Sequence, residues 1–373
     1  SGTHAELLAR EGQYAILRRL QFNDWLMSLD ARLQSVWYGP AWRSLPLWPL
    51  SVLFRLLVAL RALLYRSGLL RVEQVGVPVI VVGNVTVGGT GKTPVAAWLA
   101  RQLDARGRRV GVVLRGYGGS HRGDPRVVTA ADDPVETGDE ALVHARRGVH
   151  VVVIGGDRVQ AAELARAQGG EVIVCDDGLQ HRRLARDYEI AVVDGARGLG
   201  NGWLLPAGPL REPKRQLESV HAVVVTDRGG EGQAALAVRS PLLVPAQLRL
   251  GDAINLRSGE RRPLVALRDA PRLHAVAGIG HPEAFFRSLR AAGLAVEAHP
   301  LPDHAALGRA RPPIPADATV LMTEKDAVKC GDGAQPDWWW VELEVRIGRA
   351  EAAALIASVL ERTGLTGAGV SLG

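Results

Sequence analysis

A glycine-rich stretch at residues 83–94 has the residue types of a phosphate-binding loop. It reads GNVTVGGTGKTP, and its glycines let successive backbone N–H groups turn toward one phosphate. We expect Lys92 to neutralise β- and γ-phosphate oxygens of a nucleotide and the Thr93 hydroxyl to hold Mg²⁺. The helix predicted to follow adds its N-terminal dipole. The predicted nucleotide-binding residues are Thr86, Val87, Gly88, Gly89, Thr90, Gly91, Lys92 and Thr93.

One position departs from the consensus of such loops. The consensus has a glycine five residues before the last glycine, where this chain has Thr86. The run GGTGKT between an apolar run and an amphipathic segment still predicts a phosphate-binding loop. The alternative is a glycine turn with a purely structural role.

A phosphate-binding loop of this kind needs a carboxylate at the end of a neighbouring strand, and residues 171–181 supply one. They read EVIVCDDGLQH, an apolar run that leads directly into Asp176 and Asp177. We expect one of the two to bind Mg²⁺, directly or through water. Alternatively, the pair caps a turn. His181 is equally well explained as a structural histidine.

A second acidic motif, TGDE at residues 137–140, opens a predicted helix. Asp139 has the residue type of an N-cap, and Glu140 that of a first-turn partner of the helix dipole. The spacing alone therefore favours a structural role for both residues, with a role in catalysis as the alternative.

Short, continuous, β-branched runs alternate with amphipathic segments through the first part of the chain. This alternation predicts an α/β fold, a doubly wound parallel sheet of the P-loop NTPase type buried on both faces. Its ligand should bind at the carboxyl ends of the strands. The predicted strands are 78–83, 109–114, 150–154, 171–175, 189–193 and 221–226, and the predicted helices are 93–106, 139–147 and 158–168.

The pattern changes after residue 240. Residues 241–263 alternate around Gly251 and Gly259 and predict a β-hairpin linker. A second, smaller α/β domain is expected after it, with strands near 273–277, 295–298, 319–322 and 338–345. We therefore divide the chain into an extension at 1–26, a basic amphipathic region at 27–72, a P-loop domain at 73–240, the linker at 241–263 and a C-terminal domain at 264–373.

Composition points to an acidic partner and a reducing compartment. The 373 residues carry a formal net charge of +6, which favours nucleotides, nucleic acids or anionic lipids as partners. The two cysteines, Cys175 and Cys330, cannot form a disulfide framework or a cysteine-rich metal site, and a reducing compartment is the simplest inference. Nucleic acid is disfavoured, because the positive charge is concentrated on an apolar segment.

That segment lies between Asp30 and Glu73. The interval contains no acidic residue but six arginines, and its most apolar part is residues 45–64. Arg55 and Arg61 interrupt this part and argue against a transmembrane helix. On a helical projection the leucines cover a broad arc opposite the arginines, which is typical of a basic helix in a membrane interface. The alternative is a core helix packed on the catalytic domain.

The motifs together resemble the tetraacyldisaccharide 4′-kinase family of Gram-negative bacteria. The resemblance runs from about residue 27 to at least residue 328, and the Thr86 departure is usual in this family. Its motifs are WYG at 37–39, GNVTVGGTGKTP at 83–94, RGYG at 115–118, GDE at 138–140, GGDR at 155–158, DDGLQHR at 176–182, LLPAGPLREP at 204–213, GIGHPEAFF at 278–286, DH at 303–304 and TEKDAVK at 323–329.

The resemblance implies transfer of the γ-phosphate of ATP to the 4′-hydroxyl of a tetraacyldisaccharide 1-phosphate, which gives lipid IVA in lipid A biosynthesis. It implies that Asp139 is the general base and pairs with His304, and that Lys92 acts on the phosphates. Because Asp139 and His304 lie in different predicted domains, the pair requires closure about the linker. The implied metal ligands are Thr93, Glu140 and Asp176, and the implied substrate-binding residues are Arg158, Asp177, Gln180, His181 and Arg211.

The implied substrate also predicts where the enzyme works. A molecule with four acyl chains stays in the bilayer, so we expect a peripheral or monotopic enzyme on the cytoplasmic face of the bacterial inner membrane. Residues 41–72 would form the attachment. The expected partners are this lipid substrate and the membrane surface, without nucleic acid or an obligate protein partner.

The start of the chain has a different resemblance. Residues 1–22 resemble the C-terminal tail of an ATP-binding cassette exporter of lipid A, and the first methionine is Met27. We expect residues 1–26 to come from an upstream reading frame, a fusion or an over-extended start. A plain N-terminal amphipathic helix is the alternative.

Two other functions remain open at this point. Another P-loop kinase or Mg²⁺-dependent NTPase, acting on a soluble metabolite, would explain the phosphate loop and Asp176 but not the basic apolar helix or Arg211. A membrane-recruited nucleotide switch would hydrolyse ATP slowly without making a phosphorylated lipid, whereas a kinase is strongly stimulated by its acceptor.

Overall fold

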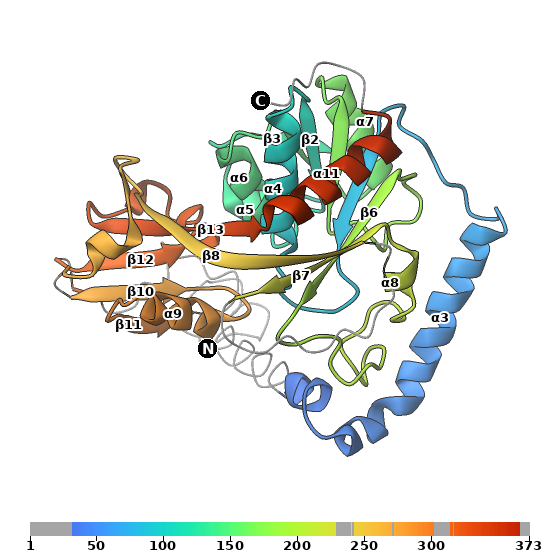
Figure 1. Cartoon of the computed structure of the whole chain (residues 1–373), viewed down its shortest axis with the longest axis horizontal. Helices are drawn as coiled ribbons and strands as arrows, with labels where there is room; N and C mark the ends of the chain where they lie inside the picture. The colour runs from blue at the N-terminus through green and yellow to red at the C-terminus, as the bar shows by residue number, and fades with distance from the viewer. Residues whose placement is uncertain are drawn as a thin grey trace, which may run out of the picture.

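The computed structural model describes residues 32–365, apart from 229–239, 241, 271, 302–313 and 316. The extension predicted at 1–26 and the predicted catalytic His304 lie outside the described residues. Within them, one sheet runs through both halves of the molecule (Figure 1). Its strand order is β11-β10-β12-β13-β8-β7-β6-β1-β5-β2-β4-β3.

The first half of the sheet is built around β1, the strand that leads into the phosphate loop. β1 lies between β5 and β6 and pairs in parallel with both, whereas β3 at the edge runs antiparallel to β4. The strands of this half are β1 (Val79–Gly83), β2 (Val110–Leu114), β3 (Arg126–Val128), β4 (Val151–Ile154), β5 (Val172–Asp176), β6 (Tyr188–Asp194) and β7 (Ala222–Asp227).

Helices cover both faces of this half. Side chains of β1 alternate, so that Ile80 and Val82 join a core formed with α4, α6 and α11, whereas Val79 and Val81 join a core formed with α7. The prediction of a doubly wound sheet is therefore confirmed. The helices of this half are α4 (Lys92–Asp104), α5 (Pro134–Thr137), α6 (Asp139–Arg146), α7 (Arg158–Ala167), α8 (Gln216–Ser219) and α11 (Arg349–Thr363).

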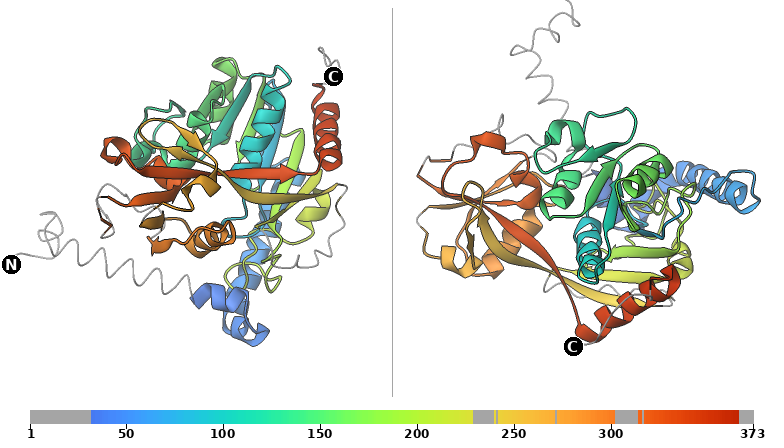
Figure 2. Two further views of the ribbon diagram at one scale, coloured as in Figure 1. Left: turned by 60° about the vertical axis from the view of Figure 1, so that its left-hand side comes forward. Right: turned by 90° about the horizontal axis from the view of Figure 1, so that it is seen from above.

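Two long strands join the halves (Figure 2). β8 (Leu243–Asn255) pairs in parallel with β7 and antiparallel with β13 (Trp338–Ile347). The predicted hairpin at 241–263 is present only at the end of β8, where β9 (Arg261–Arg262) pairs with two residues of β8. Most of the connection is instead a two-stranded ribbon of segments far apart in the sequence.

The second half packs its own core against the far end of this ribbon. Phe285, Phe286 and Leu289 of α9 pack with Trp339 of β13. The elements of this half are η2 (Leu264–Leu267), β10 (Leu273–Ala277), α9 (Pro282–Ala291), β11 (Glu297–Pro300), β12 (Thr319–Thr323), α10 (Glu324–Ala327) and η3 (Gly331–Gly333).

The C-terminal helix α11 returns to the first half. β13 crosses from the second half and leads into α11 (Figure 2), whose Leu355, Ile356 and Val359 are buried in the core shared with α4. Residues 349–363 therefore pack against the P-loop half, although the sequence-based boundary places them in the smaller domain at 264–373. The remainder of the domain division stays a prediction.

A long apolar helix lies along one side of the first half (Figure 1). α3 (Trp48–Arg66) follows the 3₁₀ segment η1 (Ala41–Leu47). Near its N-terminus, the Ser51 hydroxyl donates to the Leu204 carbonyl at 2.7 Å, and Phe54 packs on the core of the first half. Its leucines on the opposite side are exposed to solvent. Residues Ala41–Arg66 have the length and composition of a membrane span, with a mean hydropathy of 1.8.

Candidate active site at the carboxyl ends of the strands

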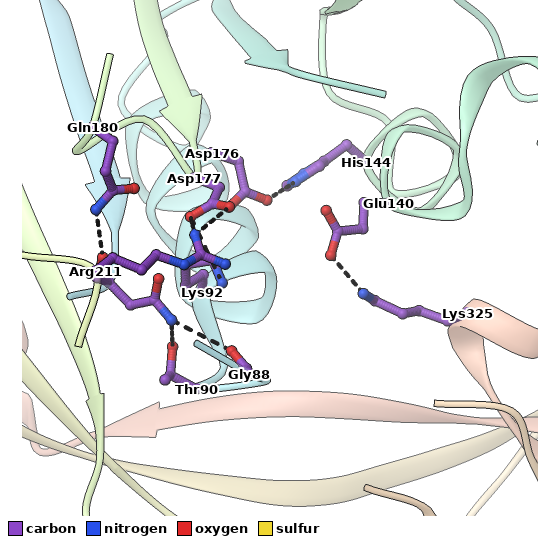
Figure 3. Close-up of polar contacts among 11 residues, drawn as sticks. Gly88, Thr90, Lys92, Glu140, His144, Asp176, Asp177, Gln180, Arg211 and Lys325 are labelled. Carbon is purple, nitrogen blue, oxygen red and sulfur yellow. Dashed lines mark hydrogen bonds and ion pairs between the residues drawn. The ribbon is translucent and has the colours of Figure 1, made fainter. Parts of the chain in front are cut away.

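The phosphate loop folds around Asn84, the residue that follows β1. The Asn84 amide donates to the Thr90 hydroxyl at 3.3 Å and to the Gly88 carbonyl at 3.4 Å (Figure 3). From the end of β7, the Thr226 hydroxyl donates to the Thr90 carbonyl at 2.9 Å. Gly91 has a φ of 88° directly before α4 begins, a conformation that glycine adopts without steric cost. These contacts hold the inner side of the loop in place.

The departure at Thr86 has a structural reason. Thr86 is buried and forms an antiparallel bridge with Leu210, and the Arg211 N–H donates to the Val85 carbonyl at 2.7 Å. A residue paired in this way is extended, so the position does not need the positive φ that favours glycine. The segment at 204–213 therefore supports the outer side of the loop.

Two cations and one carboxylate meet beside the loop. Lys92 Nζ lies 3.8 Å from Asp177 Oδ1, and an Arg211 guanidinium nitrogen lies 3.2 Å from Asp177 Oδ2 (Figure 3). Asp177 has a φ of 57°, in the left-handed region that aspartate tolerates better than most residues. The turn after β5 thus places Asp177 between the two cations that a phosphate group would meet.

Asp176 is the last residue of β5 and lies level with Val82 of β1. Its carboxylate Oδ2 is 3.1 Å from His144 Nε2, and both side chains are buried. Burial raises the pKa of Asp176, but the hydrogen bond and charge of His144, the charge of Lys92 and the Thr93 hydroxyl outweigh it and hold the pKa below its ordinary value. The carboxylate is therefore ionised at neutral pH.

The donors around Asp176 fit a magnesium ion. Asp176 Oδ1 is buried and has no hydrogen-bond partner among the described residues, and the Thr93 hydroxyl belongs to the same group of contacts. A carboxylate and a hydroxyl are the hard oxygen ligands that Mg²⁺ prefers. Glu140, the third predicted ligand, instead has its carboxylate 2.6 Å from Lys325 Nζ (Figure 3).

The GDE motif begins α6 against the RGYG motif. Gly138 has a φ of 82°, and a Cβ there would lie 2.4 Å from the Tyr117 carbonyl oxygen, so the position requires glycine. Gly138 is also the N-cap of α6, so the suggestion that Asp139 is the N-cap is wrong. Asp139 is the first residue of the helix and is buried.

Both acidic residues of the motif are paired with lysines from the second half. Lys329 Nζ lies 3.6 Å from Asp139 Oδ2, and Lys325 Nζ lies beside the Glu140 carboxylate. Lys329 Nζ is also 3.3 Å from Asp326 Oδ1 and 3.4 Å from the Gly278 carbonyl. The second half therefore already contacts α6 in this structure, through charged side chains.

Of the remaining predicted substrate residues, Arg158 is buried and its guanidinium donates to the Gly155 carbonyl, whereas Gln180 and His181 follow the turn after β5. Gln180 Nε2 donates to the Asn84 carbonyl at 3.0 Å. His181 is partly buried, and burial together with the positive charges of Arg158, Arg115 and Arg61 lowers its pKa to about 4. Arg61 comes from α3, so the apolar helix contributes charge to the site. The structure brings these residues close to the loop, and their roles in substrate binding stay predictions.

His181 is expected to stay neutral throughout the physiological range. Its pKa in the folded protein, about 4, is below the ordinary 6.5, so folding favours the neutral ring. The stability contributed by the neutral ring is present above pH 6.5 and is lost as the pH falls through about 4. NMR of the imidazole protons should show a midpoint near 4, and His181→Gln should make the free energy of unfolding less dependent on pH in that window. A midpoint above 6 would contradict this.

Sequence reasoning assigned no role to several residues of the site. For His144 the sequence contained one indication of a role, because this residue follows Glu140 by four positions on one predicted helix. Lys325 and Lys329 stood in a quoted motif without a role. For Arg228 the sequence contained no motif that indicated a role in the site. Its guanidinium donates to the Gly89 carbonyl at 3.5 Å. The pairing of Asp139 with His304 stays a prediction.

Comparisons with known proteins agree on one family. The family model described as "Tetraacyldisaccharide-1-P 4'-kinase" (LpxK) matches residues 43–361. The chain is 46% identical over 327 residues to a tetraacyldisaccharide 4′-kinase of Alkalilimnicola ehrlichii, covering 88% of this chain and 96% of the relative. It is 49% identical over 320 residues to that of Thiobacillus denitrificans, covering 84% and 94%.

A solved structure has the same fold. It is described as the apo form of LpxK from Aquifex aeolicus in complex with ATP, and it is similar to this chain with a TM-score of 0.72 and 28% sequence identity. The similarity covers 85% of this chain and 99% of the other.

Proposed function

The chain belongs to the LpxK family of tetraacyldisaccharide-1-phosphate 4′-kinases, and we propose that its phosphate loop and α6 together form the active site. The protein is an ATP-dependent kinase that acts in lipid A biosynthesis. The hydrogen bond between His144 and Asp176 carries the proposal. It holds the helix that begins at Asp139 against the strand that ends beside the phosphate loop.

The loop and the end of β5 bind the nucleotide. Backbone N–H groups of residues 86–91 and the Lys92 ammonium would contact the phosphates of ATP, while Thr93 and Asp176, which contact one another beside the loop, would hold Mg²⁺. The ion neutralises charge that develops on the transferred phosphoryl group. Glu140 becomes available as a further ligand only when its ion pair with Lys325 opens.

Asp139 accepts the proton of the sugar 4′-hydroxyl. A hydroxyl is a weak nucleophile, and a carboxylate placed beside it assists by taking the proton as the bond to phosphorus forms. His304 is proposed to orient this carboxylate and to share the proton.

Lys329 positions Asp139 through an ion pair. Its side chain is only 7% exposed, and its ammonium lies between Asp139 and Asp326. A cation within 4 Å of a carboxylate favours the charged form. Asp139 is thereby ready to accept a proton, and it exchanges Lys329 for the substrate hydroxyl when the site is filled.

Lys329→Met is expected to move the acid limb of the kcat/KM pH profile to higher pH, because it removes the cation that lies 3.6 Å from Asp139 Oδ2. Initial rates between pH 5 and 9 measure this. Lys329→Arg, which keeps the charge, should restore the acid limb. The control Lys214→Met changes an exposed lysine and should leave the profile unchanged. An unshifted acid limb in Lys329→Met would reject this positioning role.

A group of cations binds the phosphorylated sugar. Arg158, Arg115 and Arg61 lie close enough to His181 to lower its pKa, and Arg211 is held at Asp177 beside Lys92. We assign contact with the head group to Arg158 and Arg211, with Asp177, Gln180 and His181 lining the site. A neutral His181 can donate a hydrogen bond to the sugar without adding charge.

The exposed face of α3 attaches the enzyme to the surface of the inner membrane on its cytoplasmic side. Leu53, Leu56, Leu60 and Leu63 are between 52% and 62% exposed, while Ser51 anchors the helix to the body of the protein. Arginines on the same helix suit an anionic lipid surface. A substrate with four acyl chains then enters the site without leaving the bilayer.

Changing Leu56 and Leu60 together to aspartate is expected to lower binding to anionic lipid vesicles by about hundredfold or more. Each leucine buried in the bilayer contributes at least about 1.5 kcal/mol. Co-sedimentation with vesicles measures the partition. Val265→Asp, which changes an exposed apolar residue of the second half, is the control and should bind as wild type does. If carbonate at high pH fails to release the wild-type protein from membranes, α3 spans the bilayer instead.

The assay for the function uses γ-labelled ATP, Mg²⁺ and a tetraacyldisaccharide 1-phosphate. We expect a labelled bisphosphorylated glycolipid. Treating this product with a phosphatase specific for the 4′-position should remove the label. Release of labelled inorganic phosphate without labelled lipid would reject the proposed acceptor.

A further inference from the structure

A cluster of two histidines and a glutamate lies at the edge of the sheet in the second half. His274 is the second residue of β10, and Glu297 and His299 belong to β11, the edge strand. The contacts of Lys329 and Asp326 with Gly278 are at the opposite end of β10. The cluster therefore belongs to a different part of the molecule from the proposed active site.

The backbone places the three side chains on one face. β10 and β11 pair in parallel with His274 level with Glu297 and Val276 level with His299. Side chains two residues apart on a strand point to the same side. His274, Glu297 and His299 therefore project from the same face of the sheet, and their convergence follows from strand register and not from chance rotamers.

The three side chains bring their ligand atoms as close together as the ligands of one ion. His274 Nδ1 is 2.9 Å from His299 Nε2, His274 Nδ1 is 3.7 Å from Glu297 Oε2, and His299 Nε2 is 3.6 Å from Glu297 Oε1. Ligands about 2.1 Å from a tetrahedral zinc ion are about 3.4 Å apart. We propose that His274, Glu297 and His299 bind a transition-metal ion of the Zn²⁺ class, at a site independent of the kinase reaction.

A hydrogen bond between the two histidines does not account for the whole arrangement. It explains the short distance between the ring nitrogens, but it gives no role to Glu297, whose oxygens are too far from either nitrogen for a hydrogen bond. A shared ion gives all three side chains a role. Among the described residues, this is the group of histidine, cysteine and acidic side chains whose ligand atoms converge within 4.8 Å.

The burial of the cluster suits an exchangeable ion. His274 is 5% exposed and is fixed in place, whereas Glu297 reaches into solvent. Three protein ligands leave a fourth position for water. Two imidazoles favour zinc and similar ions over Mg²⁺, which prefers oxygen ligands. The bound ion would tie the edge strand β11 to β10 through side chains as well as through the backbone.

The test is zinc binding by the full-length protein without a histidine tag. Isothermal titration is done in millimolar Mg²⁺ without nucleotide, so that oxygen sites at the phosphate loop are occupied. We expect the wild-type protein to bind one more equivalent of zinc than the His299→Gln variant or the His274→Gln variant binds. Each variant should bind at this site at least about tenfold more weakly, because even the loss of a residue that only orients a ligand costs that much.

The controls separate ligand loss from misfolding. His150→Gln removes an exposed histidine far from β11 in sequence and should bind zinc as wild type does. Glu297→Gln changes an exposed side chain and should weaken binding without lowering the melting temperature in the absence of metal. Zinc should raise the melting temperature of wild type but not of His299→Gln. Equal zinc binding by wild type, His299→Gln and Glu297→Gln would overturn the proposal.

Discussion

Asp139→Asn is expected to lower kcat by about 10²–10⁴, the contribution typical of a general base. The substitution keeps the shape of a buried side chain but removes its ability to accept the hydroxyl proton. KM for ATP should change little, because the phosphates are bound by residues 86–93, and kcat/KM for the lipid should fall in parallel with kcat. Initial rates at saturating ATP and lipid measure this effect.

His304 provides the partner experiment. If the two residues act as a pair, His304→Ala lowers kcat into the same range, and the double variant is little worse than either single variant, because residues that act as a unit are not additive. The melting temperatures of the variants control for folding. The proposed pair is wrong if Asp139→Asn and His304→Ala each stay within about tenfold of wild type.

The elements that position the phosphate loop could be predicted from the sequence, because their signals are local. The strand predicted at 78–83 is observed at Val79–Gly83, and the one at 171–175 is observed at Val172–Asp176. Continuous β-branched runs bounded by glycine and charge leave little choice for a strand buried on both faces. The loop then follows from residue types at fixed spacing.

The connection between the halves could not be predicted in the same way. The alternation after residue 240 indicated a strand correctly, but local pattern does not identify its partner. β8 pairs with β13, about ninety residues later, with Arg249 level with Glu344. Likewise, the amphipathic pattern of α11 shows that the helix has an apolar face, but not that this face is buried in the first half.

Long-range ion pairs in the site were beyond sequence reasoning for a related reason. Glu140 and Lys325 are 185 residues apart, and a charge carries no information about its partner until the fold brings the two together. The spacing of the GDE motif therefore favours Glu140 as a helix-dipole partner, and only the family resemblance implies that it is a metal ligand. The fold decides that, in this structure, Glu140 is paired with a lysine.

Lys92→Met is expected to lower kcat by about 10²–10³ and to weaken ATP binding, since removing one group that stabilises charge in the transition state costs that much. The Lys92 side chain is 13% exposed, so water cannot readily replace its ammonium. Initial rates give kcat, and calorimetric titration with a non-hydrolysable ATP analogue gives the binding constant. Lys214→Met is the matched surface control.

The contact between Lys92 and Asp177 makes this prediction specific. Asp177 holds the ammonium at 3.8 Å and shares its charge with Arg211, so a nucleotide must compete with a carboxylate for Lys92. Asp177→Asn should therefore bind ATP more tightly than wild type while Lys92→Met binds it more weakly. Lys92→Arg should not restore kcat, because a planar guanidinium does not replace a compact ammonium at this position. Equal ATP binding by all three variants would mean that the charge of Lys92 is not directed at the phosphates.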